Sequence, residues 1–212
     1  SGRVQFAIGW HLRGDGDGKI SNGTNKLGDT GDYRIIGNST PRFKYGITLD
    51  AAWKGFDFSI FMQGIGKRDL WLDGCYFWGA NGQGNEWQST GFAEHWDFFR
   101  PEGDPLGANL NSYYPRVNFS GDRNTKVQTR YLQNGAYLRL KNVQLGYTLP
   151  RVWTEKAGIS SVRVYVSGDN LATITSLSKI FDPEATGSLA GTGSGKLYPL
   201  QRVISVGVNV NF

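Results

Sequence analysis

Apolar and polar residues alternate along the stretch from Arg202 to Phe212. Isoleucine, valine or phenylalanine occupies every second position from Ile204 onward, and the positions between them are small or polar. A period of two residues is typical of a β-strand that has one face in an apolar environment. The pattern predicts a strand whose apolar face is complete as far as Phe212.

Four further segments alternate in the same way, which brings the prediction to five strands. Between the first two, Lys54 and Gly55 form the two-residue connection that closes a β-hairpin. In the third segment the apolar parity shifts by one residue, and a β-bulge near Lys141 and Asn142 would absorb the shift. The predicted strands cover residues 43–53, 56–63, 135–150, 161–168 and 202–212.

Long and short connections alternate along this strand order. The hairpin turn is minimal, and residues 151–161 form a short connection in which Gly158 suits the end of a helical turn. Long connections, rich in glycine and polar residues, run from about 66 to 130 and from about 168 to 200. Outer-membrane β-barrels have short periplasmic turns and long extracellular loops. We therefore expect an extracellular loop region over residues 1–42 and a barrel segment with two long loops over residues 43–212.

A soluble β-sandwich produces the same alternation as a membrane barrel. The two folds therefore have to be distinguished by the types of residue on each face of the strands. Aromatic residues lie near the ends of the apolar faces, as in an interfacial aromatic girdle. None of the apolar-face positions in the five segments carries a charge, and Lys or Arg at mid-bilayer costs roughly 2–4 kcal/mol. Four charged residues on the opposite faces suit a wet lumen or contact with a plug: Asp50, Arg139, Lys141 and Arg163. These features favour an all-β, antiparallel transmembrane barrel segment.

Composition narrows the possible functions. The 212 residues include 30 glycines, and aromatic residues make up 14 % of the chain, which suggests β structure with many turns. There is no apolar run of the ~20 residues that a transmembrane helix needs. The net charge is +5, but the basic residues are scattered, which argues against a nucleic-acid partner. The single Cys75 excludes an intrachain disulfide and a cysteine zinc cluster.

Short motifs that resemble metal or catalytic sites are incomplete. Asp15 and Asp17 resemble part of a calcium loop, but Arg13 and Thr24 stand where an EF-hand needs ligands, so an Asp-Gly turn is the better interpretation. Residues 191–196 lack the first glycine and the final Ser or Thr of a phosphate-binding loop. The two histidines have no catalytic spacing. We expect no enzymatic activity, no resident metal and no cofactor.

Tryptophans of the first long connection are candidate contacts for a substrate or a partner protein. They are Trp71, Trp78, Trp87 and Trp96. Aromatic rings can stack on sugars or on peptide side chains, but a connection of this length also needs anchors of its own. Packing within the loop or against a partner is the favoured interpretation, and direct contact with substrate is the alternative.

Several stretches resemble the C-terminal part of SusC-like TonB-dependent outer-membrane transporters of the Bacteroidetes. They are residues 14–20, 35–64, 95–103, 113–116, 131–150, 158–175 and 181–184, followed by the final strand. The resemblance implies about the last five strands of a barrel of roughly 22 strands with a plugged lumen. It implies a non-enzymatic importer of glycan or peptide fragments, located in the outer membrane of a Gram-negative cell.

The resemblance also implies partners. These are the plug and other strands of the transporter, a SusD-like lipoprotein, the TonB complex reached through a missing N-terminal part, the barrel-assembly machinery and the lipid bilayer. The final strand fits the signal that the assembly machinery reads, with Val206, Val208, Val210 and Phe212. Because its sheet edges would be free, the segment is expected to aggregate in isolation. The alternative function is a secreted or surface carbohydrate-binding module that uses the tryptophan-rich loop.

Overall fold

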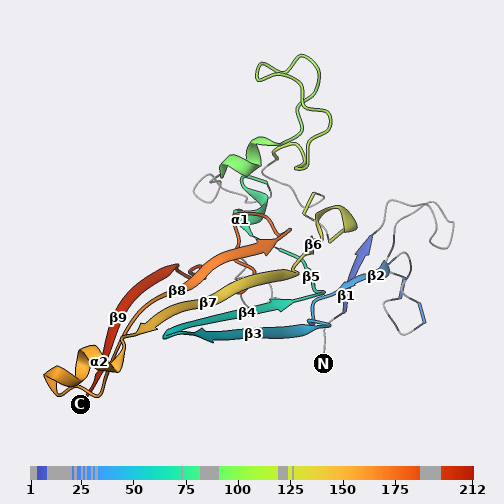
Figure 1. Cartoon of the computed structure of the whole chain (residues 1–212). Coiled ribbons are helices and arrows are strands. Elements are labelled where there is room, and N and C mark those ends of the chain that lie inside the picture. The colour runs from blue at the N-terminus through green and yellow to red at the C-terminus, as the bar shows by residue number, and fades with distance from the viewer. Residues whose placement is uncertain are drawn as a thin grey trace. The chain divides into compact units, whose positions relative to one another are not determined.

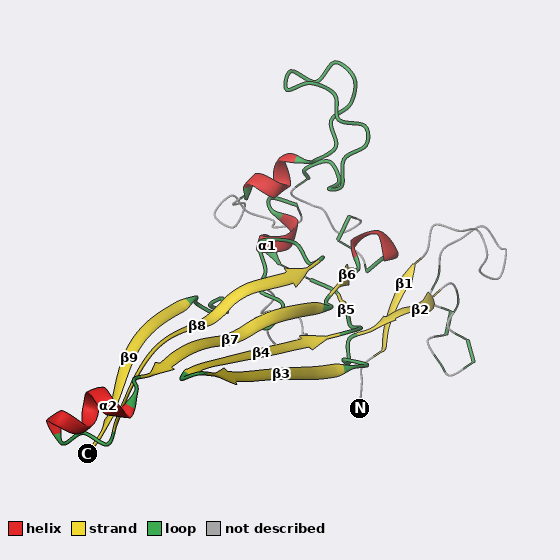
Figure 2. Ribbon diagram, in the orientation of Figure 1, coloured by secondary structure: helices red, strands yellow, loops and turns green. Residues whose placement is uncertain are grey.

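A computed structural model shows the architecture of the protein (Figures 1 and 2). The structure describes residues 4–8, 21, 23–24, 26, 28–29, 31, 33–72, 74–81, 91–118, 124–125, 127–186 and 197–212, with residues 4–8 and 33–34 described by their backbone alone. The chain divides into two compact units, each with its own organisation.

One unit is an antiparallel sheet of five strands, made from Pro41–Lys67, Gly135–Ser176 and Pro199–Phe212. The strands follow one another across the sheet in chain order, as Figure 2 shows. They are β3 (Lys44–Trp53), β4 (Phe56–Ile65), β7 (Tyr137–Thr148), β8 (Ser161–Thr175) and β9 (Val203–Asn211). The expected antiparallel all-β class is confirmed, and each of the five predicted strands is present.

The hairpin turn between β3 and β4 lies where the sequence predicts it. Trp53 pairs with Phe56, and the two residues between them both have positive φ, 46° at Lys54 and 88° at Gly55. Positive φ at both central positions is the mark of a type I′ turn, whose twist matches that of the flanking strands. This geometry explains why glycine follows the lysine.

The predicted β-bulge in β7 is also present. Along β4, Phe61 pairs with Asn142 and the next residue, Met62, pairs with Leu140, so Lys141 is the extra residue. The pairing of β7 with β8 is irregular at the same place. The bulge keeps the apolar residues before and after it on one face of the sheet.

Strand β8 continues to Thr175, beyond Gly168, at which the pattern predicted its end. Its second half pairs with the first half of β7, where Ile174 lies opposite Leu138. Asn170 has a positive φ of 52° next to the irregular pairing. The irregularity breaks the alternation of side chains, and the pattern therefore hides the second half of the strand.

The connections leave the sheet in two groups. At one end lie the β3–β4 turn and the short connection with α2 (Arg151–Thr154) and η4 (Glu155–Ala157), which Gly158 closes at a φ of 71°, as predicted. The connections from β4 to β7 and from β8 to β9 both leave from the other end, and both are long.

The other unit comprises Ser1–Thr40, Arg68–Asn134 and Leu177–Tyr198. Its elements are short: β1 (Val4–Ile8) pairs with β2 (Tyr33–Asn38), and β5 (Asp69–Leu70) pairs with β6 (Gln133–Asn134). Helical turns are α1 (Cys75–Trp78), η2 (Ala93–Trp96) and η3 (Thr129–Tyr131). Within the described residues, no helix is long and apolar enough to span a bilayer.

Candidate functional site

One face of the sheet is apolar across all five strands, and it is exposed. The register places Ala51, Phe58, Leu145, Val166 and Val206 in a single row from β3 to β9. All of these are apolar, and Val206 in the edge strand is 76 % exposed. None of the positions on this face within the described strands carries a charge. A continuous apolar surface of this extent marks contact with a membrane or another protein.

Aromatic side chains border this apolar face near both ends of the strands. At the end with the short connections, the ring centroids of Phe56 and Tyr147 lie 4.5 Å apart, and Trp53 pairs with Phe56 on the other side. At the opposite end are Phe43 and Tyr45. Tryptophan and tyrosine prefer the boundary between lipid and water, because their rings have an apolar body and a polar edge.

The opposite face of the sheet holds an ion pair that spans three strands. Arg163 on β8 donates from Nε to Oδ1 of Asp57 on β4 over 2.9 Å, and its Nη2 contacts the other carboxylate oxygen. Strand β7 lies between them and contributes Gly146 at this point. A Cβ on Gly146 would lie 2.5 Å from both Arg163 Nη2 and Asp57 Oδ1, so the missing side chain makes room for the pair.

Two further hydrogen bonds link β7 to β8 on the polar face. Asn142 donates from Nδ2 to Asp169 Oδ1 over 2.7 Å, and Arg139 donates from Nε to Thr173 Oγ1 over 2.8 Å. Arg139 is buried although it is charged. These bonds fix the polar side chains in place next to the bulge.

The structure brings three of the four predicted lumen residues to the same face. Asp50, Arg139 and Arg163 share the polar side of the sheet by register. Lys141 is the extra residue of the bulge, so the alternation does not assign it to a face. The alternation along the strands did not identify Asp57 as the partner of Arg163. A glycine in mid-strand, where another side chain can cross, was the available signal.

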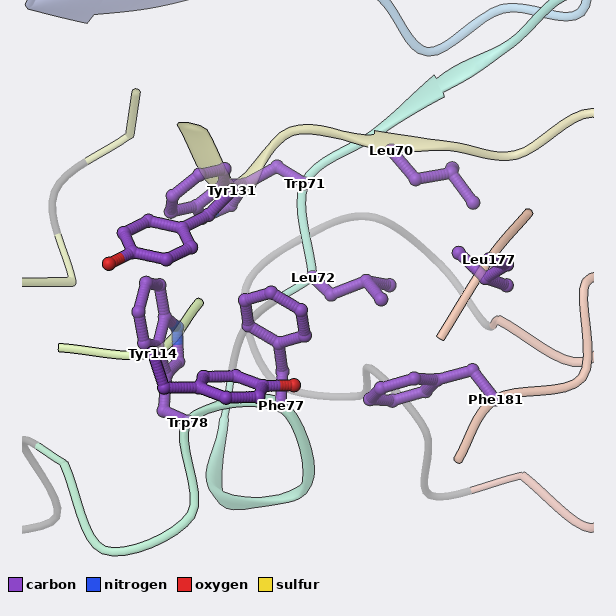
Figure 3. Close-up of a cluster of buried hydrophobic side chains, with 9 residues drawn as sticks. All are labelled: Leu70, Trp71, Leu72, Phe77, Trp78, Tyr114, Tyr131, Leu177 and Phe181. Carbon is purple, nitrogen blue, oxygen red and sulfur yellow. The ribbon is translucent and has the colours of Figure 1, made fainter. Parts of the chain in front are cut away.

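A buried aromatic cluster organises the unit that contains the long connections (Figure 3). Phe77 of α1 lies at its centre, with ring centroids 5.0 Å from Trp78, 5.8 Å from Tyr114, 6.5 Å from Tyr131 and 6.4 Å from Phe181. The cluster comprises nine residues from four separate stretches of chain: Leu70, Trp71, Leu72, Phe77 and Trp78 from the first, Tyr114 from the second, Tyr131 from the third, and Leu177 and Phe181 from the fourth. The two long connections are therefore anchored to each other by side-chain packing.

A carboxylate at the edge of the aromatic cluster is paired with two hydroxyl groups. The Glu94 carboxylate accepts hydrogen bonds from the Tyr114 hydroxyl over 2.9 Å and from the Ser178 hydroxyl over 2.8 Å. Burial raises the pKa of the Tyr114 hydroxyl above its usual range, and the nearby Glu94 carboxylate raises it further. Burial is also the main cause that raises the pKa of Tyr113 and of Tyr131. The tyrosines of the cluster are therefore protonated at neutral pH.

The four predicted tryptophans have different places. Trp71 and Trp78 belong to the aromatic cluster, with centroids 5.9 Å apart, and Trp78 is only 2 % exposed. Trp96 is 62 % exposed. Trp87 lies outside the described residues. Trp71 and Trp78 thus act as anchors of the loop, while Trp96 presents its ring to the surroundings.

Trp96 is held by a buried arginine that sequence analysis did not single out. Arg100 donates from Nη1 to the Trp96 carbonyl over 3.0 Å and from Nε to the Gly107 carbonyl over 2.8 Å, and its guanidinium carbon lies 5.6 Å from the Trp96 ring centroid. Because both acceptors are backbone atoms, no side-chain pattern in the sequence announces them. The result is an exposed aromatic ring on a fixed support.

Asp15 and Asp17, like residues 191–196, lie outside the described residues. In the described part of the chain, no three His, Cys, Asp or Glu side chains gather closely enough to hold a metal ion. Three of the proposed assembly-signal residues are exposed on β9 at the edge of the sheet: Val206, Val208 and Val210. The fourth, Phe212, directly follows β9 and is also exposed.

Comparison with curated proteins finds two relatives from Formosa agariphila. TonB-dependent receptor P3 is 32 % identical over 208 residues, which cover 93 % of this chain and 18 % of the receptor. TonB-dependent receptor P26 is 29 % identical over 208 residues, which cover 93 % of this chain and 19 % of the receptor. The chain therefore spans about a fifth of the length of these relatives. No model of a protein family matches it.

Solved structures share the fold over most of the chain. A structure of the RagAB peptide transporter superimposes with a TM-score of 0.63 at 25 % identity, covering 88 % of this chain and 19 % of that one. The RagAB peptide importer in its closed-closed state gives a TM-score of 0.64 at 24 % identity, covering 92 % of this chain and 20 % of that one.

Proposed function

Because the chain is homologous to one segment of the TonB-dependent receptors, we propose that it forms the last five strands of an outer-membrane barrel of roughly 22 strands. A longer protein supplies the other strands and the plug. Residues 43–212 form the barrel segment with its long loops, and residues 1–42 lead into it from the extracellular side. The proposal rests mainly on the exposed apolar face, which is continuous from β3 to β9.

Hydrocarbon is the solvent that suits this face. Apolar surface in contact with lipid tails carries no hydration penalty, whereas the same surface in water is unfavourable by roughly 25 cal/mol per Å². The sheet also has two outer strands, β3 and β9, each with one edge that faces no described strand. Neighbouring strands in a closed barrel would pair these edges, which is a requirement within a bilayer.

The polar face then lines the lumen or contacts the plug, and its charges are set there rather than in lipid. Asp50, Arg139 and Arg163 lie on this face by register. Asp57 and Arg163 neutralise each other's charge on this face. Either charge would be costly to remove from water without its partner. Polar interiors and apolar exteriors are the general arrangement of membrane barrels.

The whole protein is an importer driven through the TonB complex, and it takes up oligomeric nutrients. Similarity to a transporter described as a peptide transporter favours peptides over glycans. The long connections lie outside the cell in this proposal, where a SusD-like surface lipoprotein caps the barrel. Trp96 is the exposed ring through which the loop would contact the lipoprotein or the substrate. The β9 residues serve the barrel-assembly machinery as its signal.

A lysine scan of β9 in the intact protein tests the membrane location. Val206→Lys and Val208→Lys are expected to abolish or strongly reduce folding into the outer membrane, because a lysine at mid-bilayer costs roughly 2–4 kcal/mol. Ser205→Lys and Asn209→Lys, on the other face of the same strand, are the matched controls and are expected to fold. Heat-modifiable migration of the barrel on gels measures the folded fraction.

Equal folding of all four lysine variants would place the valines in water and favour the carbohydrate-binding module instead. Import itself is tested by uptake of labelled peptides and labelled oligosaccharides into cells, with and without the proton-motive force. Energy-dependent uptake of peptides alone is expected. Uptake that continues after the proton-motive force is collapsed would contradict a TonB-driven mechanism.

A further inference from the structure

The short connection between β7 and β8 exposes large apolar side chains. In α2, Val152 is 70 % exposed and Trp153 is 66 % exposed, while Thr154 next to them is buried. The turn itself is well formed: Trp153 donates its backbone N–H to the Pro150 carbonyl over 3.0 Å, and Gly158 ends the η4 turn that follows. A fixed turn therefore presents an indole and an isopropyl group together.

The apolar face of the sheet extends to the level of this turn. Leu149 donates its backbone N–H to the Val162 carbonyl over 2.9 Å, and Val162 pairs with Val210, so these three residues form one row. Arg151, where α2 begins, lies two residues after Leu149 in the chain. Phe212, two residues after Val210, has the parity of the apolar face and is 91 % exposed. The exposed apolar residues of α2 thus begin where the apolar face of β9 ends.

The charges of the turn suit the headgroup region of a bilayer. Arg151 and Lys156 are basic, and Glu155 is the one acidic residue between them. Arg151 Nε lies 2.7 Å from Glu155 Oε1, and both side chains are exposed. Long basic side chains can reach lipid phosphates while neighbouring apolar groups lie deeper. Tryptophan is enriched at this same boundary.

We propose that Val152 and Trp153 insert into the headgroup region of the phospholipid leaflet on the side of the short connections. Arg151 and Lys156 lie within reach of the lipid phosphates. The inference rests on the proposed membrane location of the sheet, and it adds a connection to the lipid-contacting surface. A turn of this kind would otherwise extend into the aqueous compartment.

Fluorescence quenching by brominated lipid tests the contact. The intact protein is reconstituted into vesicles of phosphatidylethanolamine and phosphatidylglycerol whose acyl chains carry bromine at carbons close to the headgroup. The emission of Trp153 is obtained by subtracting the emission of the Trp153→Phe variant from that of the parent protein. We expect this difference to lose more than half of its intensity in brominated vesicles and to resist quenching by iodide in the water.

The emissions of two other tryptophans, obtained in the same way, serve as controls. Subtraction of Trp53→Phe gives the emission of a ring on the apolar sheet face, which tests the proposed membrane location. Subtraction of Trp96→Phe gives the emission of a ring on the long connection, which is expected to be quenched by iodide alone. Quenching of Trp53 but not of Trp153 by bromine would overturn the inference and leave the proposed function intact. Failure of both to respond would overturn the membrane location itself. Phenylalanine keeps each position aromatic, and heat-modifiable migration verifies folding of each variant.

Discussion

Arg163 pairs with Asp57 across an intervening strand. The two residues lie on β8 and β4, and the guanidinium reaches the carboxylate over Gly146 of β7. A salt bridge between strands that are not neighbours requires the middle strand to lack a side chain at that place. The glycine therefore has a defined purpose on the polar face, and this purpose can be tested.

Gly146→Val is expected to break the Asp57–Arg163 pair, because the new side chain would occupy the space that the guanidinium crosses. The barrel of this variant should unfold at a lower temperature than that of the parent. Asp57→Asn should have a similar effect, and the double variant should be little worse than either single one, since residues that share one interaction are not additive. Ser205→Ala, on the same face, is the control. Additive effects of the two changes would show that the glycine serves another purpose.

Phe77→Ala is expected to unfold the aromatic cluster without unfolding the five-stranded sheet. The side chain is fully buried among four aromatic rings, and truncation of a buried Phe costs roughly 3–5 kcal/mol. Limited proteolysis should then cut within residues 68–134 while the barrel keeps its heat-modifiable migration. If the variant resisted protease as well as the parent, the cluster would not be what orders the long connections.

The aromatic cluster should lose stability in alkaline solution. Burial holds the pKa of Tyr114 above its usual value, which is about 10 in an unfolded chain. Above that pH the unfolded cluster loses protons that the folded cluster keeps, so stability is complete below pH ~10 and falls as the pH rises further. Tyrosinate absorbance and protease sensitivity of the loops should rise together.

Tyr114→Phe isolates the part of this alkaline effect that belongs to one hydroxyl. At neutral pH the loss of its hydrogen bond to Glu94 should cost about 1 kcal/mol. Above pH ~10 the difference between variant and parent should shrink, because phenylalanine has no proton to lose. A constant difference at every pH would mean that Tyr114 ionises as readily in the folded cluster as in water.

Deletion of Lys141 is expected to be tolerated. Without the bulged residue, Leu140 is followed by Asn142 and Val143, and the alternation of apolar and polar positions along β7 is continuous. Deletion of Gln144 is the matched control. It would move half of the strand to the wrong face, so this variant should not fold into the membrane. Equal folding of the two deletions would contradict the register.

Trp96→Ala is expected to leave folding unchanged, because the ring is mostly exposed. A Trp contact at the centre of an interface is worth 2 kcal/mol or more, or roughly a thirtyfold change in affinity. Binding of the lipoprotein and uptake of peptide, measured separately, should show which of the two Trp96 contacts. Trp153→Ala, in the short connection between β7 and β8, is the control. If neither measurement changes, the exposed ring serves no contact of either kind.

Local alternation determined much of this protein. Side chains in a strand point to opposite faces with a period of two, so the apolar faces, the Lys54–Gly55 turn and the bulge at Lys141 could be predicted from residues close together in the chain. The same reasoning predicted that charge gathers on one face. It failed in the second half of β8, where the irregular pairing near Asn170 interrupts the period.

Only the tertiary structure decided which distant residues meet. Asp57 and Arg163 are far apart in sequence, and Phe77 meets Phe181 through two different connections. Nothing in the local pattern separates Trp78, which is buried, from Trp96, which is exposed. The physical reason is that a periodic pattern records the environment of each face, while contacts between connections depend on how separate segments pack their side chains against one another.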